Sequence, residues 1–414
     1  MTKNAPELRF KGFTDDWELR KLSEGTYIKS RIGWQRLTKD EYLFAGDYYL
    51  ITGTDIDELT HSIDLSRSVY VSKERYEKDE KIQVKEGDII ITKDGTIGKV
   101  AMVQGLDKPA TLNSHLFVLR DISGELDNRF LLHVLDSPLF TKFVEATKTG
   151  STLTGLPQKT FVNFMYYLPS KEEQQRISEL LDRLDAILAL HQRKLDLLKQ
   201  LKQAYLQKMF PKNEEKVPEI RFSHFDTGWE LCRLGELAEI IRGASPRPIQ
   251  DPKWFDLSSD IGWLRISDVT EQDGRIHKLE QKLSTAGQQK TRVLKSPHLL
   301  LSIAATVGKP VINYIKTGVH DGFLIFLNPL FNTEFMFQWL EMFKPQWQKY
   351  GQPGSQVNLN SELVRNQEIT LPSFAEQDQI ANFFEQIDKT IDLHQNKLDQ
   401  LNSQKSAFLK KMFI

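Results

Sequence analysis

Few segments of the 414-residue chain have the residue types and spacing needed for phosphate or nucleotide chemistry. The segment GTIGK at 95–99 resembles part of a phosphate-binding loop, but such a loop needs Gly at position 93 and Ser or Thr after the lysine. The chain has Lys93 and Val100 at these positions. We therefore interpret the segment as a glycine turn, whose backbone N–H groups could still contact a phosphate.

The remaining candidates for catalysis do not form a known site. NPLF at 328–331 departs from the Asn-Pro-Pro-aromatic loop of adenine methyltransferases, because Leu330 replaces the second proline. No HExxH or GxSxG motif occurs, and no Cys–His pairing suits nucleophilic catalysis. Asp94 beside Lys93 and Asp321 beside His320 are interpreted as surface turn residues. The sequence thus predicts a chain without catalytic residues, metal site or cofactor of its own.

Polar, donor-rich loops, two of which contain aromatic residues, are the stronger chemical signal. They occur at 27–42, 93–99, 147–156, 241–255, 306–309 and 351–363. Arg and Lys bind guanine edges, Asn and Gln bind adenine, and Ser, Thr and backbone N–H groups bind phosphates. Each loop alone is weak evidence. Two sets of non-identical loops, however, are what a protein that reads two different DNA half-sites requires.

These loops alternate with segments that occur twice. PELRFKGFTDDWELRKLSE, from Pro6, returns from Pro218 as PEIRFSHFDTGWELCRLGE. The stretch 168–210 returns without a gap as 371–413. The order is therefore variable region, shared segment, variable region, shared segment, which indicates an internal duplication.

The longer shared segment predicts one long helix in each copy. Gly and Pro are absent from 171–210 and 373–414, and apolar residues recur in steps of four and three, which is a heptad pattern. A single such helix is not stable alone in water, so we expect the two copies to pack as an antiparallel coiled coil with pseudo-twofold symmetry. The predicted seam and partner residues are Ile177, Leu184, His191, Leu198, Tyr205, Ile380, Ile387, His394, Leu401 and Phe408. An ordinary helical hairpin in a globular core is the alternative.

One histidine of each copy falls on this seam. His191 and His394 have no second potential ligand at i+3 or i+4. We interpret them as polar seam residues that help to fix the register, rather than as metal ligands.

The variable regions are predicted to be mixed and strand-rich. The segment 86–103 is interpreted as strand, glycine turn and strand, and 296–314 is its counterpart. The expected fold class is α+β, with two such domains in tandem, each followed by a long helix. The predicted boundaries are domain 1 at 1–167, helix 1 at 168–210, a linker at 211–219, domain 2 at 220–370 and helix 2 at 371–414.

Composition narrows the class of protein. The 40% hydrophobic content fits a globular chain. The single cysteine, Cys232, excludes an intramolecular disulfide and a cysteine-cluster metal site. The sequence predicts no membrane span and no signal peptide, so we expect a cytoplasmic protein. The 55 Lys+Arg nearly balance the 56 Asp+Glu, unlike the composition of a strongly basic DNA binder.

Together these features resemble the specificity subunit of type I restriction–modification systems. The resemblance is carried by PELRFxGFxxxW and its second copy, by LPxxxEQxxI at 168–177 and 371–380, by GDIIITKDGTIGK at 87–99 and by GWLRISDV at 262–269. It covers essentially the whole chain. It implies two target recognition domains, each followed by a conserved helix, and no catalysis in this subunit.

The resemblance also implies partners. These are double-stranded DNA, modification subunits, of which we expect two, and restriction subunits. S-adenosylmethionine, ATP and Mg are expected in the partner subunits and not in this chain. Because no segment of this chain is strongly basic, we expect most non-specific DNA affinity to come from the partners.

Within this frame we predict DNA contacts in both recognition domains. They are Arg31, Trp34, Lys93, Thr96, Lys99, Lys148, Thr152, Arg242, Ser245, Arg247, Thr306, Lys309, Gln356 and Asn358. Trp34 and Trp263 could instead be core residues. In the second glycine turn Ala305 replaces the first glycine, so we expect that turn to differ in shape.

The helix length suggests how the halves of a target would be separated. Forty residues form a helix of about 60 Å, and one DNA turn measures about 34 Å. We therefore expect a bipartite, asymmetric target with an unread spacer, and helices that act as a ruler and as a docking platform. One alternative is a non-catalytic coiled-coil adaptor whose variable domains bind protein. A second is an enzyme with an unrecognised site, which the missing cofactor motif disfavours.

Overall fold

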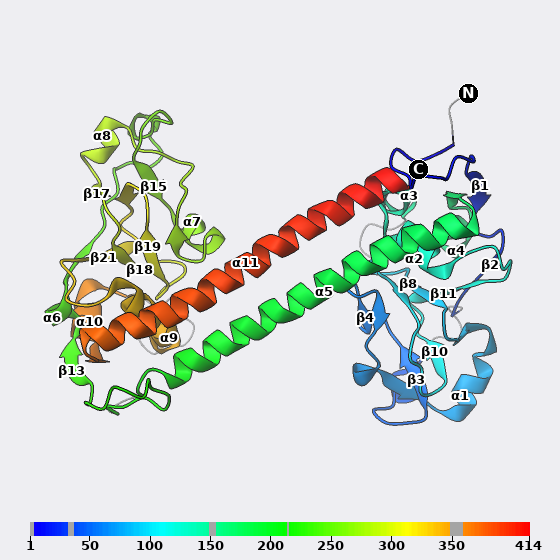
Figure 1. The fold of residues 1–414 in the computed structure, drawn as a ribbon, viewed down its shortest axis with the longest axis horizontal. Helices are drawn as coiled ribbons and strands as arrows, with labels where there is room; N and C mark the ends of the chain where they lie inside the picture. The colour runs from blue at the N-terminus through cyan, green and yellow to red at the C-terminus, as the bar shows by residue number, and fades with distance from the viewer. Residues whose placement is uncertain (1–3, 32–36, 149–154, 213–214, 348–358) are drawn as a thin grey trace. The chain divides into compact units, whose positions relative to one another are not determined.

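The computed structural model describes residues 4–31, 37–148, 155–212, 215–347 and 359–414. The chain divides into two compact units, of which unit 1 comprises residues 1–194 and 394–414 and unit 2 comprises residues 195–393. Each unit combines one strand-rich domain with parts of two long helices, α5 (Lys171–Lys208) and α11 (Phe374–Met412) (Figure 1). The predicted α+β class and both long helices are confirmed.

The first domain, residues 4–168, contains two four-stranded sheets with the strand orders β6-β3-β10-β7 and β2-β11-β8-β9. A further pair, β1-β12, joins the two ends of the domain. The strands are β1 (Glu18–Lys21), β2 (Thr26–Ser30), β3 (Tyr48–Ile51), β4 (Ile56–Asp57), β5 (Ser62–Ile63), β6 (Val69–Val71), β7 (Gln83–Val84), β8 (Ile89–Thr92), β9 (Val100–Met102), β10 (Ala110–Leu112), β11 (Leu116–Asp121) and β12 (Met165–Leu168). The helices are α1 (Lys73–Lys78), α2 (Asn128–Asp136), α3 (Pro138–Thr147) and α4 (Gln158–Phe161).

The sheet that contains β8 is buried on both faces. Ile90 and Val118 belong to the cluster that it shares with the other sheet. Ile91 and Phe117 belong to a second cluster, which contains residues of α2, α3 and the long helices. Burial on both faces explains why the apolar run in β8 is continuous rather than alternating.

The second domain, residues 218–371, has the same plan with different sheets. Its strand orders are β14-β21-β18-β19-β16 and β15-β20-β17, and β13-β22 closes the domain. The strands are β13 (Glu230–Arg233), β14 (Glu239–Arg242), β15 (Gly262–Leu264), β16 (Arg275–Ile276), β17 (Arg292–Leu294), β18 (Leu299–Ser302), β19 (Pro310–Asn313), β20 (Thr317–Val319), β21 (Phe323–Leu327) and β22 (Glu368–Leu371). The helices are α6 (Leu234–Leu237), α7 (Ile266–Glu271), α8 (Thr285–Gln288), α9 (Thr333–Trp347) and α10 (Ser361–Asn366).

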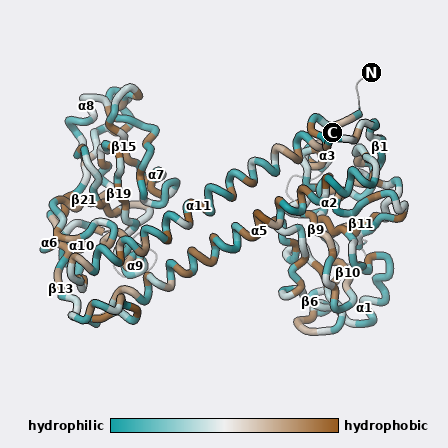
Figure 2. The backbone as a smooth tube through the Cα atoms, viewed as in Figure 1, coloured by the Kyte–Doolittle hydropathy of each residue, from teal (hydrophilic) through white to brown (hydrophobic). Residues whose placement is uncertain are grey.

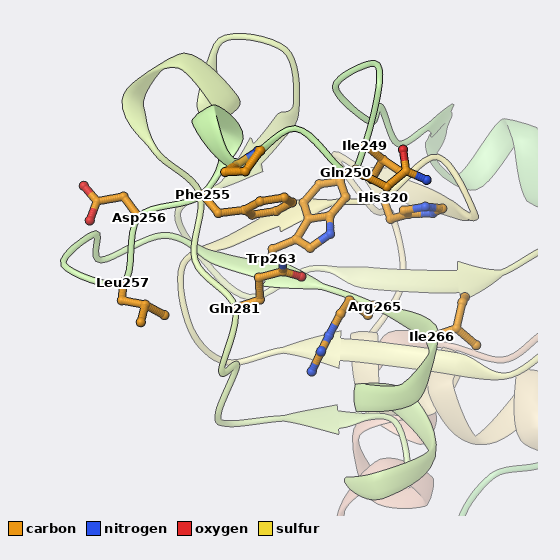
Figure 3. A pocket seen from close by; sticks show the side chains of 11 residues that line it. Ile249, Gln250, Phe255, Asp256, Leu257, Trp263, Arg265, Ile266, Gln281 and His320 are labelled. Atoms are coloured by element: carbon orange, nitrogen blue, oxygen red, sulfur yellow. The ribbon is translucent and has the colours of Figure 1, made fainter.

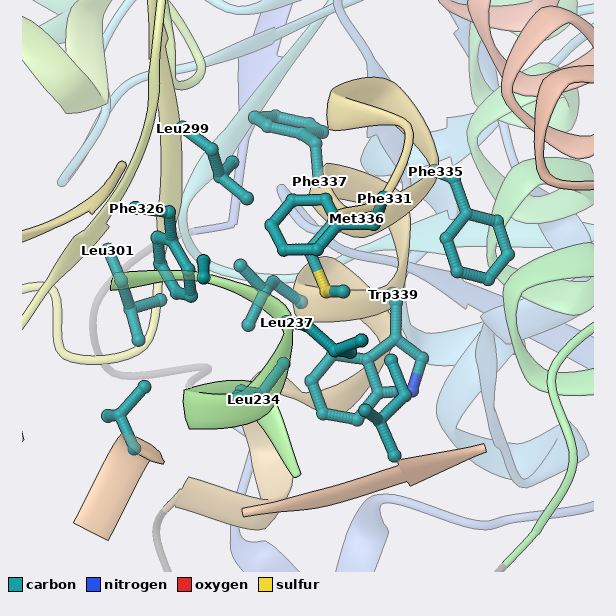
Figure 4. Packing of buried hydrophobic residues seen from close by; sticks show 14 of the residues in the cluster. Leu234, Leu237, Leu299, Leu301, Phe326, Phe331, Phe335, Met336, Phe337 and Trp339 are labelled. Carbon is teal, nitrogen blue, oxygen red and sulfur yellow. The ribbon is translucent and has the colours of Figure 1, made fainter. Parts of the chain in front are cut away.

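The core of unit 2 lies between its larger sheet and helix α9. Leu299 and Phe326 from the sheet pack with Phe335 and Trp339 from α9, as Figure 4 shows. The same cluster includes Phe384 of α11 and residues of α5. The long helices are therefore part of the domain core and do not merely follow it.

The two long helices run antiparallel within each unit. In unit 1, Asp185 contacts Lys405 and His191 contacts His394. Residue numbers therefore rise along α11 in the direction in which they fall along α5. In unit 2, Tyr205 packs edge-on against Phe383, at 4.9 Å between ring centroids. Apolar residues recur along both helices among hydrophilic ones (Figure 2).

All ten predicted seam residues lie buried or half-buried. Those that are buried are Ile177, Ile380, Ile387, His394 and Leu401, and those that are half-buried are Leu184, His191, Leu198, Tyr205 and Phe408.

Candidate nucleic-acid interface

The segments that occur twice build the same anchor in both units. In unit 1, the carboxylate of Glu173 accepts hydrogen bonds from Arg9 at 2.6 and 2.8 Å and from Nε1 of Trp17 at 3.1 Å. In unit 2, Glu376 accepts the corresponding bonds from Arg221 at 2.7 and 2.8 Å. Both carboxylates are buried, and a buried charge needs such a partner. The anchor ties the start of each repeat to the first turn of its long helix.

The glutamine after each of these glutamates makes a second attachment. Gln174 accepts the N–H of Asp127 at 2.8 Å, and Gln377 accepts the N–H of Asn332 at 2.9 Å. Asp127 and Asn332 in turn cap the helices α2 and α9. Each glutamine also donates to the carbonyl of the proline five residues earlier, at 3.0 and 2.9 Å. The LPxxxEQ motif thus fixes each long helix on its domain.

An ion pair occupies the polar position that interrupts the apolar seam. In unit 1, Nζ of Lys405 lies 2.7 Å from Asp185 and 2.8 Å from Asp136. In unit 2, Nζ of Lys202 lies 2.6 Å from Asp388. The two lysines hold equivalent places in the repeat, as do Asp185 and Asp388. The duplication therefore repeats the ion pair as well as the apolar seam.

His191 and His394 meet between the helices of unit 1. Their Nδ1 atoms are 2.8 Å apart, so one ring must carry a proton there and donate it to the other. Burial lowers the pKa of His394, and the charges of Lys194 and His191 act in the same direction. Among the described residues no group of three or more His, Cys, Asp or Glu could hold a metal ion.

The three polar loops of the first domain lie together. Nζ of Lys93 is 3.4 Å from Oγ of Ser30, and the carbonyl of Lys93 accepts the N–H of Leu156 at 2.8 Å. A backbone bridge joins Asp94 to Gly155. The turn 93–99 therefore contacts both the strand that precedes residues 32–36 and the segment that follows residues 149–154. The predicted contacts Trp34 and Thr152 lie outside the described residues.

The prediction that Arg31 contacts DNA is wrong in this structure. Its side chain is buried, and its two Nη atoms donate to Asp79 at 2.6 and 2.5 Å. Nε donates to the carbonyl of Leu112 at 3.1 Å. The side chain of Arg31 is 0% exposed, so a base or a phosphate can reach the guanidinium only if the domain opens locally.

The other described candidates of the first domain stay at the surface. Lys148 is paired with Glu145 at 2.7 Å, and Lys99 is paired with Glu58. Surface pairs of this kind contribute at most about 1 kcal/mol, so either lysine could turn to a phosphate. Thr96 is exposed.

The second glycine turn has the same backbone as the first. Ala305 adopts a positive φ of 57°, where Gly95 has 75°. Gly308 N–H donates to Ser302 at 2.8 Å, as Gly98 N–H donates to Thr92 at 3.1 Å. The expectation of a different shape is therefore wrong, since the ladder bonds around the turn hold even an alanine in the left-handed region.

The side chains of the second turn nevertheless differ from those of the first. Nζ of Lys309 lies between Asp273, at 2.5 Å, and Glu341, at 2.7 Å, and is 14% exposed. Held by two carboxylates, Lys309 cannot serve as the predicted phosphate contact without breaking both pairs, so that prediction is not supported. Thr306 is exposed.

Three predicted residues of the second domain converge on one acid. Oγ of Ser245 donates to Oδ1 of Asp321 and Nη2 of Arg247 donates to Oδ2, both at 2.7 Å. Nε of Arg242 donates to the carbonyl of Asp321 at 2.6 Å. The side chain of Arg247 is 74% exposed. The structure thus supports a common site for these three and makes Asp321, interpreted from sequence as a surface turn residue, its centre.

His320, the residue before Asp321, lines a pocket of about 640 Å³ that the sequence did not reveal. Trp263, Phe255, His320, Gln281 and Arg265 line it (Figure 3). They come from separate segments of the second domain, so no local motif could have grouped them. Gln356 and Asn358, also predicted here, lie outside the described residues.

No described helix is long and apolar enough to cross a membrane.

Comparison with known proteins agrees with this architecture. Residues 14–200 and 226–403 each match the family model of the type I restriction modification DNA specificity domain. The chain is 22% identical to the type I restriction enzyme MjaVIII specificity subunit of Methanocaldococcus jannaschii, over 98% of this chain and 94% of that protein. It is also 22% identical to the putative MjaX specificity subunit of the same organism, over 95% and 92% of the two chains.

Solved structures share the fold over nearly the full length. The S subunit of a type I system from M. genitalium has 16% identity and a TM-score of 0.63, with 99% of both chains covered. A chain from a structure concerned with complex assembly and conformational transition of the type I R-M system has 18% identity and a TM-score of 0.56, covering 97% of this chain and 99% of that one. The chain therefore belongs to the family of type I restriction–modification specificity subunits, which recognise DNA through two domains and are not themselves catalytic.

Proposed function

We propose that the chain reads a bipartite, asymmetric DNA target, with one half-site for each recognition domain. The observation that carries this proposal is the pair of loop clusters on identical frames. The same Arg–Glu anchor holds each domain. The side chains that the clusters present differ, with Lys93 and Lys148 in the first and Arg242 and Arg247 in the second. Domains that are anchored in the same way but present different side chains are suited to different half-sites.

We further propose that α5 and α11 set the distance between the half-sites. Their 38 and 39 residues correspond to helices of about 57 and 58 Å. Insertion of one heptad into both helices is expected to lengthen the tolerated spacer and to leave both half-sites unchanged. An unchanged spacer would count against the helices as a ruler.

The helices are also proposed to dock the modification subunits, through which restriction subunits join. Helix α5 exposes Ile187 and Leu190 in unit 1 and Leu197 and Leu201 in unit 2. Their spacing puts them on one helix face, and exposed apolar faces are typical of protein contacts. The equivalent positions of α11 keep only Leu393, so the two proposed docking faces differ. S-adenosylmethionine, ATP and Mg would be bound by the partners.

The deciding experiment is to sequence the methylated sites in cells that carry this chain with its cognate modification subunits. One bipartite motif is expected, and replacing residues 1–167 with those of a relative should change one half-site only. Loss of both half-sites would contradict the modular reading. If the recognition domains bound protein instead of DNA, purified complexes would lack the steep salt dependence of DNA binding, about −0.9 in slope per neutralised phosphate.

A further inference from the structure

We propose that the pocket beside Asp321 reads the edge of one purine in the second half-site, through the amide of Gln281 and the Nε2–H of His320. This inference rests on the proposed function and adds to it a place and a base class. Neither residue was among the contacts predicted from sequence.

The pocket has a rigid aromatic wall. Figure 3 shows Phe255, Trp263 and His320 beside one another, with ring centroids 6.5 and 5.6 Å apart. Trp263 lies in β15, which pairs in parallel with β20, and His320 directly follows β20. Trp263 is 2% exposed. Its ring cannot swing away, so the polar groups around it are held in place.

Gln281 supplies a hydrogen-bonding group that the domain itself does not use. The backbone carbonyl of Gln281 accepts the backbone N–H of Trp263 at 2.7 Å, and this bond fixes the backbone beside the pocket. Its half-buried side-chain amide makes no hydrogen bond to any other described residue. A glutamine amide offers an accepting carbonyl, which matches N6–H of adenine, and a donating NH2 group, which matches O6 of guanine.

His320 supplies a donor through Nε2. The N–H of Gly322 donates to its Nδ1 at 2.8 Å, a shorter contact than the 3.2 Å from Nδ1 to Oδ1 of Asp321, and this favours the neutral tautomer with its proton on Nε2. Burial lowers the pKa of His320, and the charges of Arg247 and Arg242 add to this effect against that of Asp321. The ring is therefore neutral at pH 7, and its Nε2–H suits the N7 acceptor of a purine.

The rim of the pocket carries cations that can contact DNA phosphates. Asp321 holds the loop 243–248 through Ser245 and Arg247, and a Cβ at Gly243 would come within 2.1 Å of the carbonyl of His320. This close approach holds Arg242 and Arg247 beside His320. Arg265, bound to Asp268 at 2.7 Å, adds a further cation to the pocket lining. Phosphates beside a read base meet cations of this kind.

In the described part of the first domain, the matching strand positions carry neither a tryptophan nor a histidine. β3 and β10 pair in parallel as β15 and β20 do. By that register Leu50 stands where the second domain has Trp263, and Asn113 stands in the place of His320. A change at Gln281 should therefore affect the second half-site alone.

The test is the methylated-site sequencing described above, with the full chain and its modification subunits. Gln281→Ala is expected to relax one position of the second half-site, with about a tenfold to hundredfold loss of discrimination there. The spacer and the first half-site should stay unchanged. Gln281→Asn, which keeps the amide but shortens the side chain, should relax the same position less. The control is Gln289→Ala, an exposed glutamine of the same domain that does not line the pocket.

The remaining outcomes overturn the proposal in distinguishable ways. An unchanged motif with Gln281→Ala would refute the pocket and leave the bipartite function intact. Loss of all methylation with both Gln281 variants would also refute the pocket, because removing a base-specific group should alter the methylated motif and not abolish methylation. A wild-type chain that gave no bipartite motif would refute the proposed function and the pocket with it.

Discussion

Removing the buried carboxylate of Glu173 should loosen unit 1 and leave unit 2 unchanged. Glu173 is 0% exposed and holds both the guanidinium of Arg9, 14% exposed, and the indole N–H of Trp17. Its bond to Arg9 is the main reason why the pKa of that guanidinium is raised. The substitution Glu173→Leu leaves one charge and one donor buried without their acceptor.

The expected loss can be worked from these contacts. Removing one member of a buried ion pair costs about 3–5 kcal/mol. Because Arg9 keeps some contact with solvent, we expect the lower end, about 3 kcal/mol. The indole adds little, since the matching Nε1 of Trp229 is buried without a partner in unit 2 and is tolerated there. The double substitution Arg9→Met with Glu173→Leu removes both charges and should recover most of the loss.

Native-state hydrogen exchange can separate the two units in one sample. The β1–β12 amides report on unit 1 and the β13–β22 amides on unit 2. A loss of about 3 kcal/mol corresponds to exchange that is roughly a hundredfold faster. This increase is expected in β1–β12 only. Equal acceleration in both strand pairs, or none in either, would refute the reasoning, as would a double variant no better than the single one.

Three further predictions follow from the same contacts. Arg31→Ala should destabilise unit 1 by about 3 kcal/mol, because it removes the closest cation of the buried Asp79 and leaves only the longer contact with Arg75, at 3.5 Å, and hydrogen exchange should detect this without any base-specific change in the methylated motif. Ala305→Gly should stabilise unit 2 by about 0.5–1 kcal/mol, since it relieves a left-handed alanine, whereas Gly95→Ala should destabilise unit 1 by a similar amount; denaturant melts of both variants check the pair. Nuclear magnetic resonance titration should show His61 and His394 on opposite sides of the ordinary pKa of 6.5. Burial favours a lower pKa for His61, but Asp136 and Asp185 outweigh this effect and raise the pKa. The protonated His61 therefore stabilises the folded state fully below pH 6.5. This stabilisation is lost as the pH rises through the higher pKa of the folded state. The lowered pKa of His394 acts oppositely, costing stability as the pH falls below 6.5.

The architecture was predictable because its signals repeat along the chain. The heptad spacing in 171–210 and 373–414 predicts both long helices, and a duplicated pattern leaves few ways to bury two such stripes. The loops 93–99 and 147–156 were both predicted to contact DNA, and the structure brings their described parts together.

The individual side chains were less predictable, since their partners are distant in sequence. Arg31 meets Asp79 and Lys309 meets Glu341 only after the sheets form, and a residue list cannot show which cations are already paired. Asp321 was undervalued for the same reason, as its partner Arg247 is 74 residues away. The shape of the turn at Ala305 was predicted wrongly because alanine disfavours a positive φ. The hydrogen bonds between the flanking strands fix the turn in spite of that preference.

The first recognition domain takes part of its core from the last residues of the chain. Leu409, Met412 and Phe413 lie in the same buried cluster as Trp17, and Leu8 donates to the carbonyl of Lys411 at 2.9 Å. Unit 2, in contrast, is one continuous stretch of residues 195–393.

This arrangement sets an order of assembly during synthesis. Unit 2 has all of its residues before unit 1 does, although residues 1–194 of unit 1 are made before any residue of unit 2. The first recognition domain is thus completed after the second, and its closure joins Leu8 to Lys411, which adds a loop entropy that short-range contacts avoid. A premature stop shortly after residue 393 would therefore damage the first recognition domain and spare unit 2.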